Sequence, residues 1–266
     1  MTLTIATWNI NSVRLREALV ARLLAEEAPD VLCLQECKSP VEKMPLTAFA
    51  ALGYVHAVAR GQKGYNGVAI LSKRPLADAG AVDWANLGHA RHVAARLADG
   101  PGEGVVIHNL YVPAGGDVPD RGENLKFAQK LDFLAHLRDE FREARPRRAI
   151  LVGDLNIAPG EDDVWSHRQM LSVVSHTPQE VEAMAEVADA GGWTDVTRAD
   201  HPQGKLFSWW SYRAPDWDRA DKGRRLDHVW ATADITGAAH GSRILRAARG
   251  WDAPSDHAPV FATFDL

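Results

Sequence analysis

The sequence predicts an α/β protein in which two packed β-sheets are flanked by helices. Apolar runs of strand length outnumber the amphipathic helical segments, and many of these runs are apolar on both faces, as in strands that are covered on both sides. The helical segments are spread along the chain rather than gathered at one end. Because no linker rich in Pro, Gly or Ser divides the 266 residues, we expect one domain over residues 1–266.

The first half of the chain combines one helix with several strands. Residues 12–28 predict an amphipathic helix, because leucines recur there at helical spacing and Pro29 follows. The run VLCLQE at residues 31–36 is almost continuously apolar, which is typical of a buried strand. We expect strands at residues 3–8, 31–36, 54–59, 67–71, 92–97 and 104–112.

The second half adds two helices and further strands. Residues 123–144 predict a long helix with one apolar stripe. Another helix begins at Thr177, whose side chain can accept from the Glu180 amide in a capping box, with Pro178 at the first helical position. Glycines at 191–192 end it. Strands are expected at residues 148–156, 225–231 and 258–264, with an aromatic run at residues 207–212.

Composition excludes several classes of protein. Hydrophobic residues make up 46% and charged residues 24%, which is the balance of a soluble globular protein and excludes a disordered chain. No apolar stretch of about 18 residues is present, which excludes a membrane-spanning helix. The first ten residues lack the basic start and the apolar run of a secretory signal. The net charge of −5 does not indicate a nucleic-acid binder, so a DNA-binding hypothesis must rest on local chemistry.

The two cysteines, Cys33 and Cys37, are too few for a disulfide framework or for a zinc site of four thiolates. We expect two reduced thiols in or beside a buried strand, and therefore a cytoplasmic location.

Polar residues collect at the ends of the predicted strands. Each alone is typical of a turn, but together they supply many carboxylate and amide oxygens. These residues are Asn9, Glu36, Asp154, Asn156, Asp227, Asp256 and His257.

This set favours a hard divalent cation rather than zinc. Mg²⁺ takes one or two protein carboxylates, and Glu36 and Asp256 are the candidates, with Mn²⁺ as a substitute ion. Asp154 could orient and deprotonate a water for attack on phosphorus. His257 beside Asp227 would be an oriented, charged imidazole that neutralises a phosphate.

Eight motifs in order resemble the exonuclease III family of DNA repair nucleases, within the endonuclease/exonuclease/phosphatase superfamily. The likeness runs from the first strand to the last, and it is the eight motifs together that make it specific. The motifs are TWNIN (7–11), LQECK (34–38), GYNGVAILS (64–72), YVPAGG (111–116), GDLNIAP (153–159), FSWWSYR (207–213), RLDHVW (225–230) and SDHAPV (255–260).

The resemblance implies a four-layer sandwich of two mixed β-sheets flanked by helices, as in deoxyribonuclease I. It implies Mg²⁺-dependent hydrolysis of DNA phosphodiesters by an enzyme that acts as exodeoxyribonuclease III, as an endonuclease cutting 5′ to abasic sites, or as both. The first activity covers 3′-to-5′ degradation and the cleaning of 3′ ends. The implied partner is double-stranded DNA with abasic sites or 3′ ends, and we expect a monomer that does not bind membranes.

The resemblance also assigns roles to residues. Its catalytic positions match Tyr111, Asp154, Asn156, Asp227 and His257. Its metal-site positions match Asn9, Glu36, Asp154, Asn156, Asp256 and His257. We expect substrate contacts from Lys38, Asn66, Trp209, Arg224 and Leu226. By resemblance, Trp209 and Leu226 line a pocket that admits a base-free sugar.

Several positions depart from the pattern of the family. Ala114 follows YVP where many relatives carry Asn or Gln, and Asn11 stands where some have an aspartate near the metal. Arg224 replaces the bulky apolar residue that relatives often have two positions before Leu226. The segment at residues 161–176 also departs from the pattern of the family, and we expect it to form a loop or helix over the DNA groove.

Two other functions stay open from the sequence. One is another phosphoesterase of the same superfamily, which would act on an inositol phosphate or a lipid phosphodiester. The other is a DNA-binding or scaffold protein that has kept the fold without catalysis. The presence of Glu36, Asp154 and His257 argues against the second, and the absence of a basic amphipathic helix argues against a membrane substrate.

Overall fold

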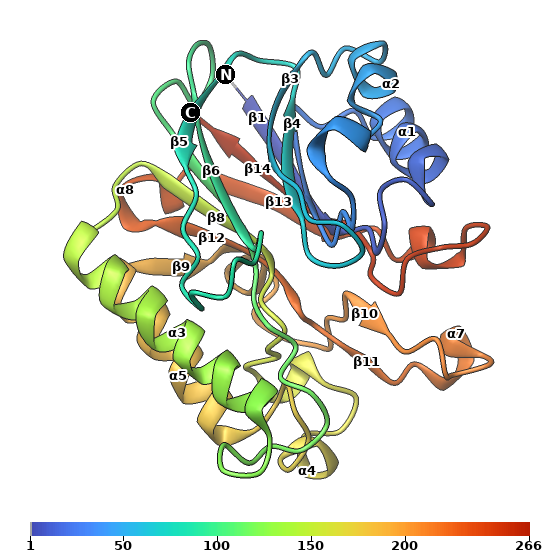
Figure 1. The fold of residues 1–266 in the computed structure, drawn as a ribbon, viewed down its shortest axis with the longest axis vertical. Coiled ribbons are helices and arrows are strands. Elements are labelled where there is room, and N and C mark those ends of the chain that lie inside the picture. Colours follow the sequence, from blue (N-terminus) through green and yellow to red (C-terminus); the bar gives the residue numbers. More distant parts are fainter. Residues whose placement is uncertain (1) are drawn as a thin grey trace.

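The computed structural model describes residues 2–266 and contains two six-stranded β-sheets packed face to face (Figure 1). Apolar side chains from both sheets, such as Ile5 and Val152, form one core between the sheets. A second core lies between the first sheet and the helices near the N-terminus, and a third lies between the second sheet and two long helices. The predicted four-layer sandwich is therefore confirmed.

The first sheet has the order β13-β14-β1-β2-β4-β3. In this sheet β1 runs parallel to β2 and antiparallel to β14. Consequently the end of β1 at Asn9 lies beside the end of β2 at Gln35, and Glu36 follows directly. The strands are β1 (Thr2–Asn9), β2 (Val31–Gln35), β3 (His56–Arg60), β4 (Val68–Ser72), β13 (Ala239–Ile244) and β14 (Val260–Asp265).

The second sheet has the order β5-β6-β7-β8-β12-β9. Its register places Tyr111 of β7 and Asp227 of β12 on either side of Asp154 of β8. Three polar residues that are distant in sequence thus meet at one edge of this sheet. The strands are β5 (Leu76–Gly80), β6 (His92–Leu97), β7 (Val106–Tyr111), β8 (Ala149–Asp154), β9 (Trp193–Asp195) and β12 (Asp227–Thr232).

Helices cover the outer face of each sheet (Figure 1). The first sheet is covered by α1 (Glu17–Glu26) and α2 (Leu46–Ala50), and the second by α3 (Leu125–Ala144) and α5 (Pro178–Gly191). The short elements are η1 (Val41–Lys43), η2 (Glu161–Asp163), α4 (His167–Met170), α6 (Val196–Asp200), β10 (Trp209–Trp210), α7 (Trp217–Ala220), β11 (Gly223–Arg224), α8 (Ala233–Thr236) and η3 (Arg246–Gly250). No helix within residues 2–266 has the length and apolarity that crossing a membrane requires.

The capping box at Thr177 is confirmed, because its side chain accepts from the Glu180 amide and Gly192 ends the helix in the left-handed region. The expected helix at 12–28 is shorter and begins at Glu17, because Asn11 and Ser12 have positive φ angles and start a turn instead. Both cysteines are buried and free, as expected.

Gly153 fixes the position of the polar edge of the second sheet, because it directly precedes Asp154. Its φ is +142°, and a Cβ atom there would lie 1.9 Å from the carbonyl oxygen of Leu110 on the neighbouring strand. Only glycine allows β7 and β8 to approach this closely.

We therefore expect Gly153→Ala to lower the free energy of unfolding by at least about 3 kcal/mol, through backbone strain and the clash with β7. Urea denaturation followed by circular dichroism measures this loss. Gly204→Ala is the matched control, because Gly204 also has a positive φ but no atom lies within 4 Å of its Cβ position. Equal losses in both variants would contradict the close-approach argument.

Candidate active site

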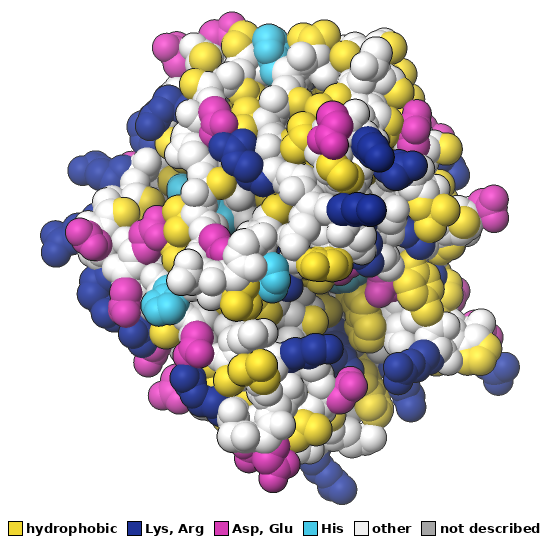
Figure 2. Space-filling view, viewed as in Figure 1, with side chains coloured by type: hydrophobic (Ala, Val, Ile, Leu, Met, Phe, Trp, Pro, Cys, Tyr) yellow, Lys and Arg dark blue, Asp and Glu magenta, His cyan; other side chains and the backbone are white. Residues whose placement is uncertain are grey.

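The polar strand ends open into a cleft of about 810 Å³. Figure 2 shows a hollow between the hairpin that carries α7 and the part of the molecule that carries α4, with Lys and Arg side chains at its rim. Nine of the residues singled out from the sequence line this cleft. They are Glu36, Tyr111, Asp154, Asn156, Trp209, Arg224, Leu226, Asp256 and His257.

Asn9 lies behind the cleft and links the two sheets. It is fully buried, and its Nδ2 donates to Oε1 of Glu36 at 2.9 Å and to Oδ2 of Asp154 at 2.8 Å. Its Oδ1 accepts from the backbone N–H of Asn11. The hydroxyl of Tyr111 also donates to Oε1 of Glu36, at 2.8 Å. One carboxylate from each sheet is therefore held by the same amide.

Glu36 is kept ionised by a neighbouring cation. Burial raises the pKa of Glu36, but the Lys38 ammonium, 2.7 Å from Oε2, and the bond from Asn9 outweigh burial and leave that pKa below its usual value. Lys38 also donates to Oδ1 of Asn11 at 2.5 Å, and Nδ2 of Asn11 donates to Asp256 at 3.1 Å. The Lys38 ammonium is thus bonded directly to Glu36 and linked to Asp256 through the amide of Asn11.

His257 and Asp227 form the expected imidazole–carboxylate pair. Nδ1 of His257 lies 2.8 Å from Oδ2 of Asp227, and Nε2 lies 3.7 Å from Oδ2 of Asp154. The hydroxyl of Ser208 donates to Asp227 at 2.6 Å and holds that carboxylate in place. Burial lowers the pKa of His257, but Asp227 and Asp154 overcome this and raise it to about 10.

The pKa of Asp154 lies in the range that suits a base near neutral pH. Burial raises its pKa to about 7, although the His257 charge and the bond from Asn9 act in the opposite direction. Its Oδ1 accepts from the backbone N–H of Asn156 at 2.9 Å, and Oδ2 accepts from the side-chain amide of Asn156 at 3.2 Å. These donors fix the direction of the carboxylate.

Two places in the cleft could hold a divalent cation. Asp154, Asp227 and His257 lie close enough together to share one, but a protonated His257 repels a cation and already bonds to Asp227. Glu36 and Asp256 instead offer carboxylate oxygens to the cleft, next to amide oxygens. An all-oxygen set is the kind that Mg²⁺ or Mn²⁺ prefers.

The substrate-side residues are only partly brought together. The indole N–H of Trp209 donates to Asp256 at 3.0 Å, and Leu226 lies next to it in the cleft. Asn66 is buried outside the cleft lining and donates to Gln62, while its backbone carbonyl accepts from the Lys38 N–H. Its place in the structure is to support the loop of Lys38.

The sequence did not single out several residues that shape the site. Ser208 bonds to Asp227, and the fully buried Lys130 donates to the backbone carbonyl of Asn156 at 2.8 Å while pairing with Glu180. The only sign of Lys130 in the sequence is its place beside the apolar stripe of α3. The segment at 161–176 forms η2 and α4 and contributes Trp165, Val174 and Ser175 to the cleft wall.

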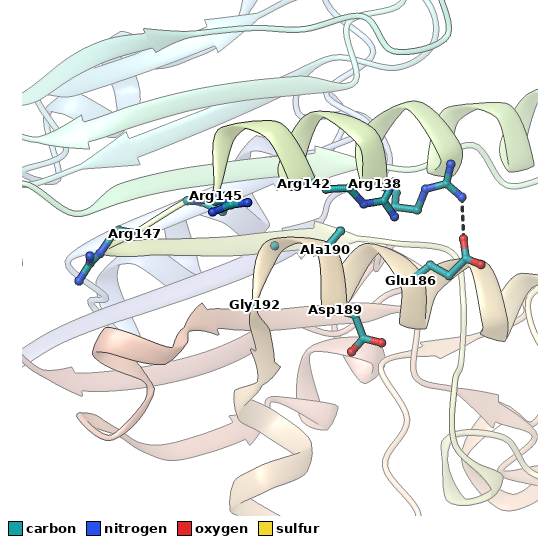
Figure 3. A pocket seen from close by; sticks show the side chains of 10 residues that line it. Arg138, Arg142, Arg145, Arg147, Glu186, Asp189, Ala190 and Gly192 are labelled. Carbon is teal, nitrogen blue, oxygen red and sulfur yellow. Dashed lines mark hydrogen bonds and ion pairs between the residues drawn. The ribbon is translucent and has the colours of Figure 1, made fainter.

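A second hollow, of about 720 Å³, lies between the C-terminal ends of α3 and α5 (Figure 3). Arginines line it opposite Glu186 and Asp189, and Arg138 pairs with Glu186 at 2.7 Å. None of the polar strand ends reaches this hollow. Its lining holds four arginines and two carboxylates but none of the residues predicted for catalysis, so the first cleft is the candidate active site.

Residues 6–257 match the model of the endonuclease/exonuclease/phosphatase family. This match covers almost the whole chain, so the chain belongs to that family. The resemblance that the eight motifs indicated is confirmed.

One relative of known activity and two solved structures are similar to this chain over almost its whole length. The chain is 29% identical to an exodeoxyribonuclease III from Haemophilus influenzae, over 97% of this chain and 98% of the relative. It is similar to the solved structure of an AP endonuclease from Archaeoglobus fulgidus, with 32% identity, a TM-score of 0.91 and coverage of 99% and 100% of the two chains. A 3′ phosphatase from Neisseria bound to product DNA hairpin matches with 32% identity, a TM-score of 0.89 and the same coverage.

The charge on His257 can be tested directly. Because Asp227 and Asp154 raise the pKa of His257 to about 10, we expect the imidazole to stay doubly protonated from pH 5 to about 9. Asp227→Asn removes a negative charge, so it should lower this pKa by at least about one unit. Ring ¹⁵N chemical shifts measured by NMR report the titration. Asp252→Asn removes an exposed carboxylate and should leave it unchanged. A His257 that titrates near pH 6.5 in the unaltered protein would contradict the assignment.

Proposed function

We infer that this chain is a DNA repair nuclease that hydrolyses DNA phosphodiester bonds. The proposed activities are those of an exodeoxyribonuclease III, which removes nucleotides and blocking groups from 3′ ends, of an endonuclease that cuts 5′ to abasic sites, or both. The observation that carries the proposal is the convergence of Glu36, Asp154 and the His257–Asp227 pair in one cleft. The relatives named as exodeoxyribonuclease III, AP endonuclease and 3′ phosphatase support it.

The proposed metal is Mg²⁺, with Mn²⁺ as a substitute, held by Glu36 and Asp256. The donor set fits, because both carboxylates reach the cleft and the Lys38 ammonium already pairs with Glu36 there. When bound, the ion polarises a phosphoryl oxygen and stabilises the charge on the leaving oxygen. Asn9 orients Glu36 and Asp154 through its amide rather than facing the cleft itself.

The side chains of the chain account for the remaining steps of hydrolysis. Asp154 accepts a hydrogen bond from the attacking water and takes its proton as the water oxygen bonds to phosphorus. The bond from phosphorus to the departing sugar oxygen then breaks. The cationic His257 neutralises a phosphate oxygen, while the Tyr111 hydroxyl and the Asn156 amide donate to Glu36 and Asp154 and hold these two carboxylates in position.

The proposed substrate is double-stranded DNA with an abasic site or a 3′ end. Trp209 and Leu226 supply aromatic and apolar surface beside the catalytic carboxylates, which suits a nucleotide taken out of the stack. Arg224 supplies a cationic group to the same cleft, and Lys38 lies 2.7 Å from the cleft residue Glu36. A single domain, a monomeric state and a cytoplasmic location stay predictions of the sequence.

One labelled duplex that carries both an abasic analogue and a recessed 3′ end tests the function. With Mg²⁺ we expect nicking 5′ to the abasic site, shortening from the 3′ end, or both, and chelation by EDTA should abolish either product. Product lengths on one gel separate the two activities. Cleavage of an inositol phosphate or a lipid phosphodiester without cleavage of this duplex would overturn the DNA assignment and favour the other phosphoesterase class.

Asp154→Asn tests the proposed base. The amide keeps the shape of the side chain but cannot take a proton, so we expect turnover to fall by about 10²-fold or more while the duplex still binds. Single-turnover cleavage and equilibrium binding measure the two effects. Asp162→Asn, at an exposed carboxylate outside the cleft, should keep both. Near-normal rates in Asp154→Asn would remove this residue from the mechanism.

A further inference from the structure

One wall of the cleft is a short extended segment whose side chains alternate in direction. Lys222, Arg224 and Leu226 all face the cleft, whereas Gly223 and Arg225 are buried in the body of the protein. This is the period-two alternation of a β-strand, and β11 pairs here with β10 (Figure 1). The wall therefore presents two cations in a row, followed by an apolar residue next to the catalytic Asp227.

The buried side of this segment makes the wall rigid. Arg225 forms two bonds to Asp163, at 2.7 and 2.8 Å, and a third to Asp195 at 2.7 Å. At Gly223 a Cβ atom would lie 2.5 Å from the ring of Phe207, so the backbone approaches that ring as closely as a glycine allows. The direction in which Lys222 and Arg224 point is therefore fixed by packing on the opposite side.

Each of the two cations rests on a tryptophan. The Lys222 ammonium lies 4.5 Å from the ring centre of Trp165, and the Arg224 guanidinium lies 4.9 Å from that of Trp209. Trp165 belongs to the 161–176 segment, and its backbone N–H donates to the Gly223 carbonyl at 3.1 Å. The tryptophans hold the cations in place and leave their charge unneutralised.

Neither cation is paired with an acid. Within the part of the chain that the structure describes, no carboxylate forms an ion pair with Lys222 or Arg224. Nη1 of Arg224 donates only to the Val174 carbonyl at 3.1 Å and to the Ser175 hydroxyl at 2.9 Å. Burial lowers the pKa of Arg224, because the nearby charge of Glu180 acts in the opposite direction without forming an ion pair and does not offset burial, and an anion from outside would relieve this cost.

We propose that Lys222 and Arg224 form a phosphate track, which binds two successive phosphates of the strand being cut, next to the scissile one. The proposal rests on the nuclease function proposed above and adds which groups of the substrate this wall contacts, namely backbone phosphates. Side chains two apart on an extended strand are separated by about 6–7 Å, a spacing suited to neighbouring phosphates of one strand. Leu226 and Trp209 then face the sugar between the track and the carboxylates.

Salt dependence of DNA binding tests the track, because each phosphate contact releases counterions. We expect Lys222→Met and Arg224→Met each to weaken binding of a fluorescein-labelled duplex with a recessed 3′ end, by roughly fivefold at 0.1 M salt. Each should also reduce the slope of log Kd against log salt by about one. Fluorescence anisotropy in EDTA measures both without cleavage. Lys222 is exposed, so its replacement does not threaten folding.

Arg219→Met is the matched control, because Arg219 is an exposed cation on the same hairpin but outside the cleft lining. It should keep the slope of the unaltered protein. An unchanged slope in the Lys222 and Arg224 variants, or an equal decrease in the control, would overturn the track. A loss of affinity that is the same at every salt concentration would do so as well, because it would indicate contact with bases. If the proposed nuclease function itself is wrong, the unaltered protein will not cleave DNA, and this result is separate from the binding measurements.

Discussion

The site depends on one buried amide that spans the two sheets. Asn9 ends a strand of the first sheet, and its Nδ2 donates to Glu36 of that sheet and to Asp154 of the other. Two buried carboxylates repel each other unless donors and cations offset the cost. A single amide supplies a donor to both and fixes their separation. The packing of one sheet on the other therefore places Glu36, the proposed metal ligand, beside Asp154, the proposed base.

Charge in the cleft is divided between its floor and its wall. The floor carries the carboxylates, and Lys38 and His257 offset part of their negative charge at short range. The wall carries Lys222 and Arg224, and within residues 2–266 no carboxylate forms an ion pair with either. A polyanion that enters this cleft can meet unpaired cations along the wall while its reacting phosphate lies over the floor. The negative net charge of the whole chain gives no sign of this arrangement.

The strand ends could be predicted because apolar runs stop at polar residues, and the order of the motifs identified the family. The register that sets Tyr111 and Asp227 beside Asp154 could not be read from the sequence, since it depends on which strands pair. The edge strands β5 and β13 were missed because most of their side chains are not buried. Ser208 and Lys130 were missed because a lone hydroxyl or amine does not reveal which buried group it will meet. Asn66, which was expected at the substrate, donates to Gln62 in the structure, and its contact with substrate stays a prediction.

Anomalous diffraction from crystals soaked in Mn²⁺ tests most directly which carboxylates of the two sheets bind the metal ion. We expect a peak bonded to Glu36, with Asp256 beside it and the His257–Asp227 hydrogen bond intact. A peak enclosed by Asp154, Asp227 and His257, with the imidazole turned away from Asp227, would contradict this expectation. So would the absence of any peak in the cleft.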